Sequence, residues 1–498
     1  MSGARVTVPE RSDVGADAGA GGASRAQSPV NKQHAGAAPE RLNAVPVCHV
    51  VKGEAVFGTE LEFGPPGRRF ATPALDLDAL VWSRQQPPPA FGTPLAEIMD
   101  ILVETGRWLT ADPQGLVGEA LDFSVQTSPL PRDVLERSYR SLGRLFDRKV
   151  MEFEVQQAFG GTDVLDGWRE VDAPSGRRHR VRTFPPRLVH VIAGNAPGVA
   201  AQSVIRGALT KGVHLIKIPS NDLFTASAVL RALSAVAPGH PVARSFSAAY
   251  WRGGDARVEG LLFRPQFFDK LVAWGGETTI RSAREYIGPG FELVAFDPKT
   301  SISMIGREAF ASDEILAEVA DRAAVDATMM NQQACVSSRF QFVEGDEAQV
   351  DRYCALLQKR LGVERFTCSA TQAPPSGSLR DEIEGLRGME PYYRIWGDGR
   401  GDGLVIRSEE PVEFHPDNRV VNVVPVGDLR EAVRHANVAT QTVGIYPPQR
   451  KAELRDALAS AGTQRVVELG KAGAVEGGIP HDGFLPLQRF VRWVNDEG

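Results

Sequence analysis

Residues 187–222 read RLVHVIAGNAPGVAAQSVIRGALTKGVHLIKIPSND, and this stretch decides the fold. The apolar run Arg187–Ala193 predicts a short buried strand, and GNAPG after it predicts a turn. Val199–Lys211 has apolar residues at helical spacing and is followed by a glycine, which is typical of a helix end. Val213–Ile218 then predicts a second strand. A strand, a helix and a second strand in this order form one parallel βαβ unit.

The same alternation continues after residue 222. Polar residues 220–222 predict an N-cap for a helix over Leu223–Val236. Leu271–Trp274 and Leu293–Phe296 predict two more strands, and a helix is expected from Glu277 between them. Repeated strand–helix alternation predicts an α/β fold with a Rossmann-type parallel sheet and helices on both faces.

The flanking regions indicate further elements. Helices are expected over Pro94–Leu109, Arg132–Phe146 and Asp313–Met330, and a strand over Arg339–Val343. Residues 1–45 are rich in Ala, Gly, Ser and Pro, which predicts a disordered tail. With 498 residues the chain exceeds the roughly 250–300 that one core supports, so at least two domains are expected.

Composition excludes several classes of protein. The formal net charge of −6 argues against nucleic acid as the main partner, because no large positive field is available to neutralise phosphates. Four cysteines in 498 residues are too few for a disulfide framework, which favours a reducing, cytoplasmic location. No apolar stretch approaches the roughly 20 residues that cross a bilayer, so no integral membrane segment is expected.

Cys335 is the cysteine with the most informative surroundings. It lies in the polar loop NQQACVSS (331–338) between a predicted helix and a predicted strand. Reactive cysteines occupy such polar places, whereas inert ones are buried among apolar residues. Cys354, on the apolar face of a helix, and Cys368, in an expected strand, are interpreted as packing residues. Cys48 is uninformative.

Other polar residues follow strand ends. Asn195, Lys217 and Gly275 all fall at or just past the carboxyl end of a predicted strand, where parallel sheets bind ligands. Taken singly, a lysine at a strand end is usually solvated, and glycine often serves only to turn the chain. His481-Asp482 suggests a polar site, although a surface turn is the more ordinary interpretation. The histidines form no metal-binding pattern, so no metal is expected.

Six segments, in order, resemble the acyl-CoA reductases of bacterial luminescence and related fatty-aldehyde pathways, a branch of the aldehyde dehydrogenase superfamily. The resemblance covers roughly Leu75 to the C-terminus. It implies an aldehyde dehydrogenase-like fold in which a second α/β domain carries the nucleophile. The segments are VHVIAGNAPGVAAQSVIRGALTKG (189–212), HLIKIPSND (214–222), LVAWGGETTI (271–280), FDPKTSISMIG (296–306), NQQACVSSR (331–339) and PHDGFLPLQRFVRWVN (480–495).

The resemblance implies roles for two catalytic residues. Cys335 is similar to the family's thiolate nucleophile. Asn195 resembles the asparagine whose amide, together with the Cys335 backbone N–H, stabilises the tetrahedral oxyanion. These roles imply that a fatty acyl-CoA is reduced to an aldehyde and free coenzyme A through an acyl-cysteine intermediate.

The resemblance also implies a nicotinamide cofactor. Lys217 resembles the lysine that holds the adenosine ribose, and Gly275 resembles the glycine beneath the pyrophosphate, with Gly276 and Glu277 beside it. NAD-preferring members often carry a glutamate where this chain has Ser220. Because that carboxylate would repel a 2′-phosphate, Ser220 beside Lys217 favours NADPH.

One departure from ordinary aldehyde dehydrogenases bears on the reaction. When the segments are aligned without a gap from Lys299, the water-activating glutamate of those enzymes corresponds to Ala295 in this chain. Only a gap in the alignment would place Glu292 at that position. A reductase has little use for that base, because its acyl-enzyme meets a hydride rather than water. A second family glutamate, which contacts the nicotinamide ribose, has only a vague counterpart near Glu413 and is not assigned.

Three alternatives stay open at this point. The same chemistry would serve an acyl group on a carrier protein; an oxidative aldehyde dehydrogenase would need the missing base; a non-catalytic scaffold for an acyl-transfer complex would not need Cys335. An acyl-transfer or acyl-activating partner enzyme and a homo-oligomer are expected. The expected organisation is a disordered tail (1–45), an NADP-binding domain with N-terminal helices (46–296), a catalytic domain (297–480) and a C-terminal closing segment (481–498).

Overall fold

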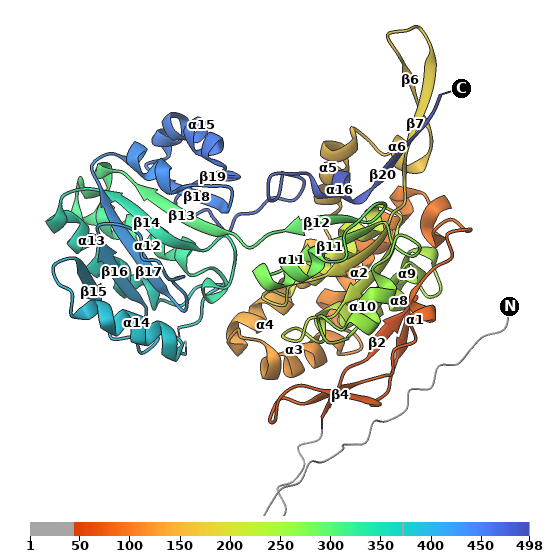
Figure 1. The fold of residues 1–498 in the computed structure, drawn as a ribbon, viewed down its shortest axis with the longest axis horizontal. Coiled ribbons are helices and arrows are strands. Elements are labelled where there is room, and N and C mark those ends of the chain that lie inside the picture. The colour runs from red at the N-terminus through yellow and green to blue at the C-terminus, as the bar shows by residue number, and fades with distance from the viewer. Residues whose placement is uncertain (1–43, 371–372, 498) are drawn as a thin grey trace, which may run out of the picture. The chain divides into compact units, whose positions relative to one another are not determined.

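The computed structural model describes residues 44–370 and 373–497 (Figure 1). The predicted N-terminal tail therefore lies almost wholly outside the described residues. The described residues belong to one compact unit, which contains two seven-stranded sheets. The neighbouring folds reported below confirm the predicted α/β class, whereas the predicted domain boundaries stay a prediction.

The first large sheet contains the strands predicted around residues 187–296. Five consecutive strands, starting from one edge, are parallel, and two antiparallel strands from residues 49–56 complete the other edge. In spatial order they are β12 (Glu292–Phe296), β11 (Lys270–Trp274), β8 (Arg187–Val191), β9 (Val213–Lys217), β10 (Phe246–Ala249), β2 (His49–Val51) and β3 (Glu54–Val56).

Helices cover both faces of this sheet. Neighbouring residues of a strand point in opposite directions, so each buried strand contributes side chains to both faces. In β9, Ile216 packs with the helices of one face and Leu215 with those of the other. The first face carries α2 (Leu95–Ala111), α3 (Leu116–Thr127), α4 (Arg132–Ser141), α5 (Arg148–Phe159), α7 (Gly198–Leu209) and α8 (Thr225–Val236); the second carries α10 (Ala256–Leu262) and α11 (Glu277–Arg284).

The strand register aligns the carboxyl ends of β8, β9 and β11 at one edge of the sheet. Val191 at the end of β8 pairs with Lys217 of β9 on one side and with Ala273 of β11 on the other. The turns that follow these three strands therefore start at the same edge of the sheet. This is the edge where the sequence predicted a ligand site.

The second large sheet is parallel except for one edge strand. One face packs on α12 (Asp313–Ala327) and α13 (Glu347–Leu361), and the other on α15 (Lys451–Ala461). In spatial order its strands are β15 (Tyr393–Trp396), β16 (Leu404–Ser408), β17 (Val420–Val426), β14 (Ser338–Glu344), β13 (Thr300–Ile305), β18 (Thr440–Tyr446) and β19 (Arg465–Glu468).

The end of the chain returns to the first sheet region. After α16 (Pro486–Phe490), strand β20 (Arg492–Asp496) pairs antiparallel with β7 (Arg178–Phe184), which pairs with β6 (Arg169–Asp172) (Figure 1). The Lys270 side chain in β11 donates to the carbonyl of Arg489 at 2.8 Å. The closing segment is thus fixed to strands that precede it by about 200 residues or more.

Several predicted boundaries are corrected. The helix expected from Leu223 begins at Thr225, because Asp222 accepts a hydrogen bond from the Thr225 backbone N–H and holds the residues before it outside the helix. The helix expected to Phe146 ends at Ser141 and continues as a short 3₁₀ turn. Cys368 lies in a tight turn bridged to Arg365 rather than in a strand, although it is buried as expected.

Among the described residues, no helix combines the length and the apolar character needed to cross a bilayer.

Burial of His49 in β2 leads to a testable pH dependence of stability. Its Nε2 accepts the Tyr250 backbone N–H at 3.1 Å, and burial lowers its pKa to about 4. As pH falls below about 6.5 the unfolded chain binds a proton that the folded chain refuses, so stability is lost until about pH 4. His49→Gln keeps an acceptor without this titration.

From pH 7 to pH 5 the wild type should therefore lose about 2 kcal/mol more of its free energy of unfolding than His49→Gln does. Urea unfolding of both proteins across this range measures the difference. Parallel pH profiles would contradict a neutral, buried His49.

Candidate active site

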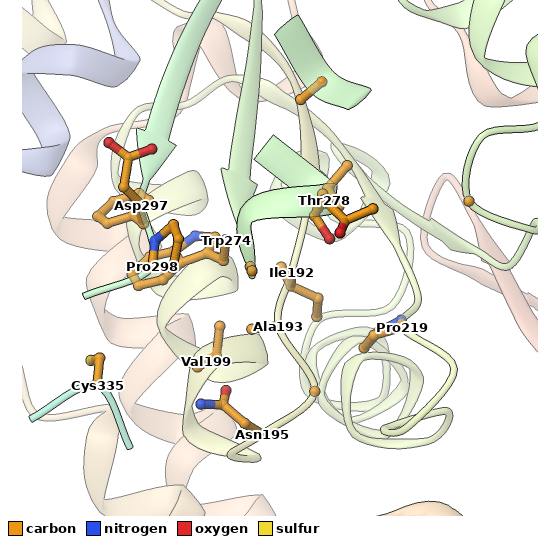
Figure 2. Close-up of a pocket in the computed structure, with 18 of the residues that line it drawn as sticks. Ile192, Ala193, Asn195, Val199, Pro219, Trp274, Thr278, Asp297, Pro298 and Cys335 are labelled. Atoms are coloured by element: carbon orange, nitrogen blue, oxygen red, sulfur yellow. The ribbon is translucent and has the colours of Figure 1, made fainter. Parts of the chain in front are cut away.

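A cavity of about 1030 Å³ lies at the carboxyl edge of the first sheet (Figure 2). The turns after β8, β9 and β11 form one side of it, and the loop before β14 and the strand β18 contribute the other. Six of the seven site residues predicted from the sequence line this cavity: Asn195, Lys217, Ser220, Gly275, Gly276 and Cys335.

The turn after β8 is shaped by a close approach. A Cβ on Gly194 would lie 2.1 Å from the Asn221 side-chain oxygen, so only glycine lets the turns after β8 and β9 meet. The next residue, Asn195, donates from Nδ2 to the backbone carbonyl of Gln333 at 3.0 Å. Asn195 is thus tied to the loop that carries Cys335, and in Figure 2 its amide points toward the side where Cys335 lies.

The loop that carries Cys335 has an unusual backbone. Helix α12 was expected to reach Met330 but ends at Ala327, and Met330, Asn331 and Gln332 adopt positive φ angles of 49°, 51° and 69°. Such residues persist only where their surroundings fix them, and they cluster at functional sites. Here Asn331 accepts the Ser369 backbone N–H at 2.8 Å, and Gln332 donates to the carbonyl of Val420 at 2.9 Å.

Cys335 faces the cavity and is exposed, whereas Cys354 and Cys368 are fully buried packing residues. The protein around the cavity raises the pKa of the Cys335 thiol through desolvation. Hydrogen bonding by Gln441 and by the Cys335 and Val336 backbone lowers that pKa, and the Asp482 charge raises it. Desolvation by the surrounding cavity walls is the largest of these effects on the Cys335 pKa, so formation of the thiolate depends on the local hydrogen-bond donors.

Gln441, in β18, joins Cys335 to the end of the chain. Its Nε2 donates to Asp482 Oδ1 at 2.7 Å. Asp482 has a positive φ of 50° and its side chain is only 5% exposed, so the segment His481-Asp482 is a wall of the cavity rather than a surface turn. Burial lowers the pKa of His481 to about 4, and its ring packs edge-on against Trp274.

Lys217 brings a cation into the cavity. Its Nζ lies 5.9 Å from the Tyr250 ring centroid and 5.6 Å from that of Trp251. Desolvation lowers its pKa and the Glu259 carboxylate raises it, yet among the described residues no carboxylate lies within ion-pair distance of Nζ. A desolvated ammonium group held by two aromatic rings suits hydroxyl or phosphate oxygens.

Gly275 and Gly276 connect β11 to α11. Gly276 is the N-cap residue of α11, no side chain caps the helix start, and a Cβ placed on Gly276 would have no atom within 4 Å. A helix start of this kind favours an anion. Glu277, predicted beside these glycines, is absent from the cavity lining and pairs with Arg281 one turn along α11.

Neither candidate for the water-activating base faces the cavity. Glu292 begins β12, pairs with Lys270 at 3.1 Å and does not line the cavity. Ala295 does not line it either. The carboxylate that this segment contributes is Asp297. Glu413 is also outside the lining, whereas His415, two residues later, belongs to it. His415 and Gln441 were not predicted as site residues, because neither belongs to a recognisable sequence motif.

Solved structures with this fold include aldehyde dehydrogenases. An NADP-dependent glyceraldehyde-3-phosphate dehydrogenase from Bacillus halodurans C-125 superposes with a TM-score of 0.65 at 14% identity, covering 90% of this chain and 98% of that one. An NAD-dependent benzaldehyde dehydrogenase from Corynebacterium glutamicum gives 0.67 at 15% identity, covering 91% and 98%. The predicted aldehyde dehydrogenase-like fold is thereby confirmed.

Sequence relatives identify the family. A long-chain acyl-protein thioester reductase from Vibrio harveyi is 28% identical over 76% of each chain, and one from Aliivibrio fischeri is 32% identical over 69% of this chain and 70% of its own. The family model described as "Acyl-CoA reductase (LuxC)" matches residues 94–493. The chain therefore belongs to this acyl-CoA reductase family of oxidoreductases, as the six segments indicated.

Proposed function

We propose that this protein reduces a long-chain fatty acyl thioester to the fatty aldehyde with NADPH, through an acyl intermediate on Cys335. The observation that carries the proposal is that Cys335 and Asn195 share one cavity with Lys217 and Gly275. A nucleophile, an oxyanion donor and two phosphate- or ribose-binding elements in one cavity are what such a reaction requires.

The residues present fit a dinucleotide with a 2′-phosphate. Open space at the start of α11 leaves room for a pyrophosphate against Gly275 and Gly276, and the Lys217 cation stands at the end of β9. Ser220 is exposed at the edge of the cavity and brings no negative charge. When bound, NADPH supplies the hydride that reduces the acyl group.

The chemistry of the chain's own residues follows from their positions. The Cys335 thiolate attacks the thioester carbonyl, and the Asn195 Nδ2 group, which has a second hydrogen besides the one donated to Gln333, stabilises the oxyanion with a backbone N–H. The donor thiol leaves with a proton, which gives acyl-Cys335. After hydride addition the hemithioacetal releases the aldehyde and restores the thiol.

The segment around Ala295 supports reduction rather than oxidation. With Ala295 and Glu292 both outside the cavity lining, this segment offers no glutamate to activate water against acyl-Cys335. An oxidative aldehyde dehydrogenase, the second of the three alternatives above, needs such a base. A non-catalytic scaffold would need neither this cavity nor a cysteine that faces it.

Two acyl donors, acyl-CoA and an acylated protein, would undergo the same chemistry. The family description names acyl-CoA, whereas the relatives are named acyl-protein thioester reductases. The relatives' names favour an acyl group carried on a protein, delivered by an acyl-transfer or acyl-activating partner enzyme.

The test is NADPH oxidation by the full chain with a long-chain acyl-CoA and, in parallel, with the same acyl group as a protein thioester. Aldehyde and free thiol in equal amounts from either donor would establish the reductase, and the ratio of the two kcat/KM values identifies the donor. Aldehyde oxidation by NADP without any thioester reduction would refute the proposal.

Ser220→Glu tests the cofactor assignment. A carboxylate beside the 2′-phosphate should raise the Kd for NADPH by about 100-fold, since like charges in contact cost several kcal/mol. The Kd for NADH should stay the same or fall, because the carboxylate can accept from the 2′-hydroxyl. Fluorescence titration measures both constants, with Ser220→Ala as the uncharged control. An equal loss of both cofactors would place Ser220 away from the 2′ position.

A further inference from the structure

Gln441 lies in a β-bulge beside the nucleophile loop. At this point of the pairing between β13 and β18, one residue of β13, Ser301, is opposed by two of β18, Gln441 and Thr442. Bulges occur next to active sites, where they re-aim a side chain. Ser301 Oγ accepts the Thr442 backbone N–H at 3.2 Å and donates to the carbonyl of Cys335 at 2.8 Å. The bulge is therefore joined to the nucleophile through one hydroxyl group.

Asp482 sets the orientation of the Gln441 amide. Gln441 is 3% exposed, and its Nε2 is the atom that donates to Asp482. An ionised carboxylate only accepts hydrogen bonds, so it fixes the NH₂ end of the amide on its own side. Gln441 Oε1 consequently has no donor among the described residues, an unfavourable state for a buried acceptor. The local fold thus favours the donor end of this amide over its acceptor end.

A tight turn holds the Asp482 carboxylate in place. The backbones of His481 and Phe484 close the turn with hydrogen bonds in both directions, at 2.9 Å and 3.2 Å. The two central residues, Asp482 and Gly483, have positive φ angles of 50° and 83°, as a type I′ turn requires. Asp-Gly is a favoured pair in such a turn. The carboxylate is therefore fixed against Gln441 before any substrate binds.

Two arginines near the sulfur act on it through their charge. Desolvation lowers the pKa of Arg339 in β14 and of Arg465 in β19, and the Cys335 thiolate raises the pKa of both. Their N–H groups donate to backbone carbonyls, to a threonine hydroxyl and, for Arg339, to Asp417. Gln441, in contrast, gives the sulfur a hydrogen bond.

The groups around Asp482 shift its ionisation in both directions. Burial raises the pKa of its carboxyl, the hydrogen bond from Gln441 and the Lys299 ammonium lower it, and Asp297 raises it. His481, whose Nε2 lies 3.8 Å from Oδ1, is neutral at pH 7 because burial lowers its pKa to about 4. The carboxylate is therefore stabilised by the same amide that it orients.

We propose that Gln441 is a further catalytic residue, which donates a hydrogen bond to the Cys335 sulfur, and that Asp482 is a positioning residue that keeps this donor in place. The inference rests on the proposed function, in which the sulfur is negatively charged before it attacks and again when the aldehyde leaves. In the second step the C–S bond breaks, its electron pair passes to sulfur, and the carbonyl re-forms from the alkoxide. Because a hydrogen bond to a charged atom is the stronger one, the donor favours release of the aldehyde.

The pH dependence of Cys335 alkylation by iodoacetamide tests the contact, with the modified peptide identified by mass spectrometry. Gln441→Met keeps the length of the side chain and removes the donor. The midpoint of the profile should rise by about one pH unit, and the rate at pH 7 should fall about tenfold. Gln358→Met is the matched control, because Gln358 donates to the Gly403 carbonyl outside the cavity. An unchanged profile in Gln441→Met would overturn the contact.

Gln441→Glu is the second variant, and thermal unfolding checks the fold of both. The glutamate keeps the shape of the side chain and places a negative charge beside the sulfur. The midpoint should therefore rise at least as far as in Gln441→Met. If Gln441→Met does not fold, the profile of Gln441→Glu decides, and an unchanged midpoint there would equally remove Gln441 from the catalytic residues.

Asp482→Asn separates positioning from the charge of Asp482. Loss of the charge speeds alkylation, because that charge raises the pKa of Cys335. Release of the amide slows it, since an asparagine can accept from Nε2 or donate to Oε1. In a Gln441→Met background only the charge effect remains, so Asp482→Asn should speed alkylation at least about threefold there and should not speed it in the wild-type background. Equal effects in both backgrounds would show that Asp482 acts through its charge alone.

Thioester reduction by the same variants separates this inference from the proposed function. Gln441→Met should lower kcat about tenfold and leave the Kd for NADPH unchanged. If the wild type reduces no thioester but Gln441→Met still shifts the alkylation profile, the reaction is wrong while the contact stands. If the wild type reduces thioesters and the two profiles coincide, the contact is wrong while the reaction stands.

Discussion

Cys335→Ala is expected to abolish thioester reduction and to leave NADPH binding unchanged. Loss of the nucleophile from a covalent mechanism costs on the order of 10⁶ in kcat, which takes turnover below detection. Cofactor binding should survive, because Lys217 and Gly275 lie on the first sheet while Cys335 is carried by the loop before β14. Steady-state assays and fluorescence titration with NADPH give the two readouts.

The matched control is Cys48→Ala, since Cys48 precedes β2 and does not line the cavity. It should keep full activity. Incubation with a radiolabelled acyl donor in the absence of NADPH should label the wild type and the control but not Cys335→Ala. A labelled Cys335→Ala protein, or one that has lost NADPH binding as well, would contradict the role of this thiol.

Asn195→Ala is expected to lower kcat by about 10²–10³-fold, the usual cost of one oxyanion donor. The side chain also donates to the Gln333 carbonyl, and loss of that bond should cost only about 1 kcal/mol of stability. The Kd for NADPH should not change. Single-turnover acylation of Cys335 is the direct measurement, because the oxyanion forms in that step.

Asn221→Ala provides the comparison, since Asn221 lies in the neighbouring turn and also lines the cavity. If kcat falls equally in both variants, the loss comes from a disturbed contact between the turns after β8 and β9, which approach each other at Gly194, rather than from lost oxyanion stabilisation. A selective loss in Asn195→Ala supports the donor role. Unchanged acylation in Asn195→Ala would remove it from the catalytic residues.

Much of the first sheet was predictable from local patterns. Arg187–Val191 and Val213–Lys217 are short, mainly apolar runs that are almost wholly buried, as expected for parallel strands covered on both faces, and a helical pattern lies between them. The carboxyl ends of parallel strands meet at one edge, so Asn195, Lys217 and Gly275 could be grouped before any coordinates.

The other wall of the site was not predictable in this way. Gln441 belongs to a buried strand, and its contact with Asp482 joins positions 41 residues apart, which no local spacing reveals. The end of α12 at Ala327 depends on Ser369 and Val420, whose backbone groups hold Asn331 and Gln332 out of the helix. Tertiary contacts of this kind override helical propensity.

The return of β20 to β7 has a consequence for biosynthesis. Residues 178–184 emerge from the ribosome some 300 residues before their partner strand at 492–496, and Lys270 likewise precedes the carbonyl of Arg489 by 219 residues. Domains often fold in order as they are made, N-terminal first. Here the earlier sheet region acquires its last strand only after some 300 further residues have been made, so a chain released before residue 492 exposes an unpaired β7 edge open to aggregation.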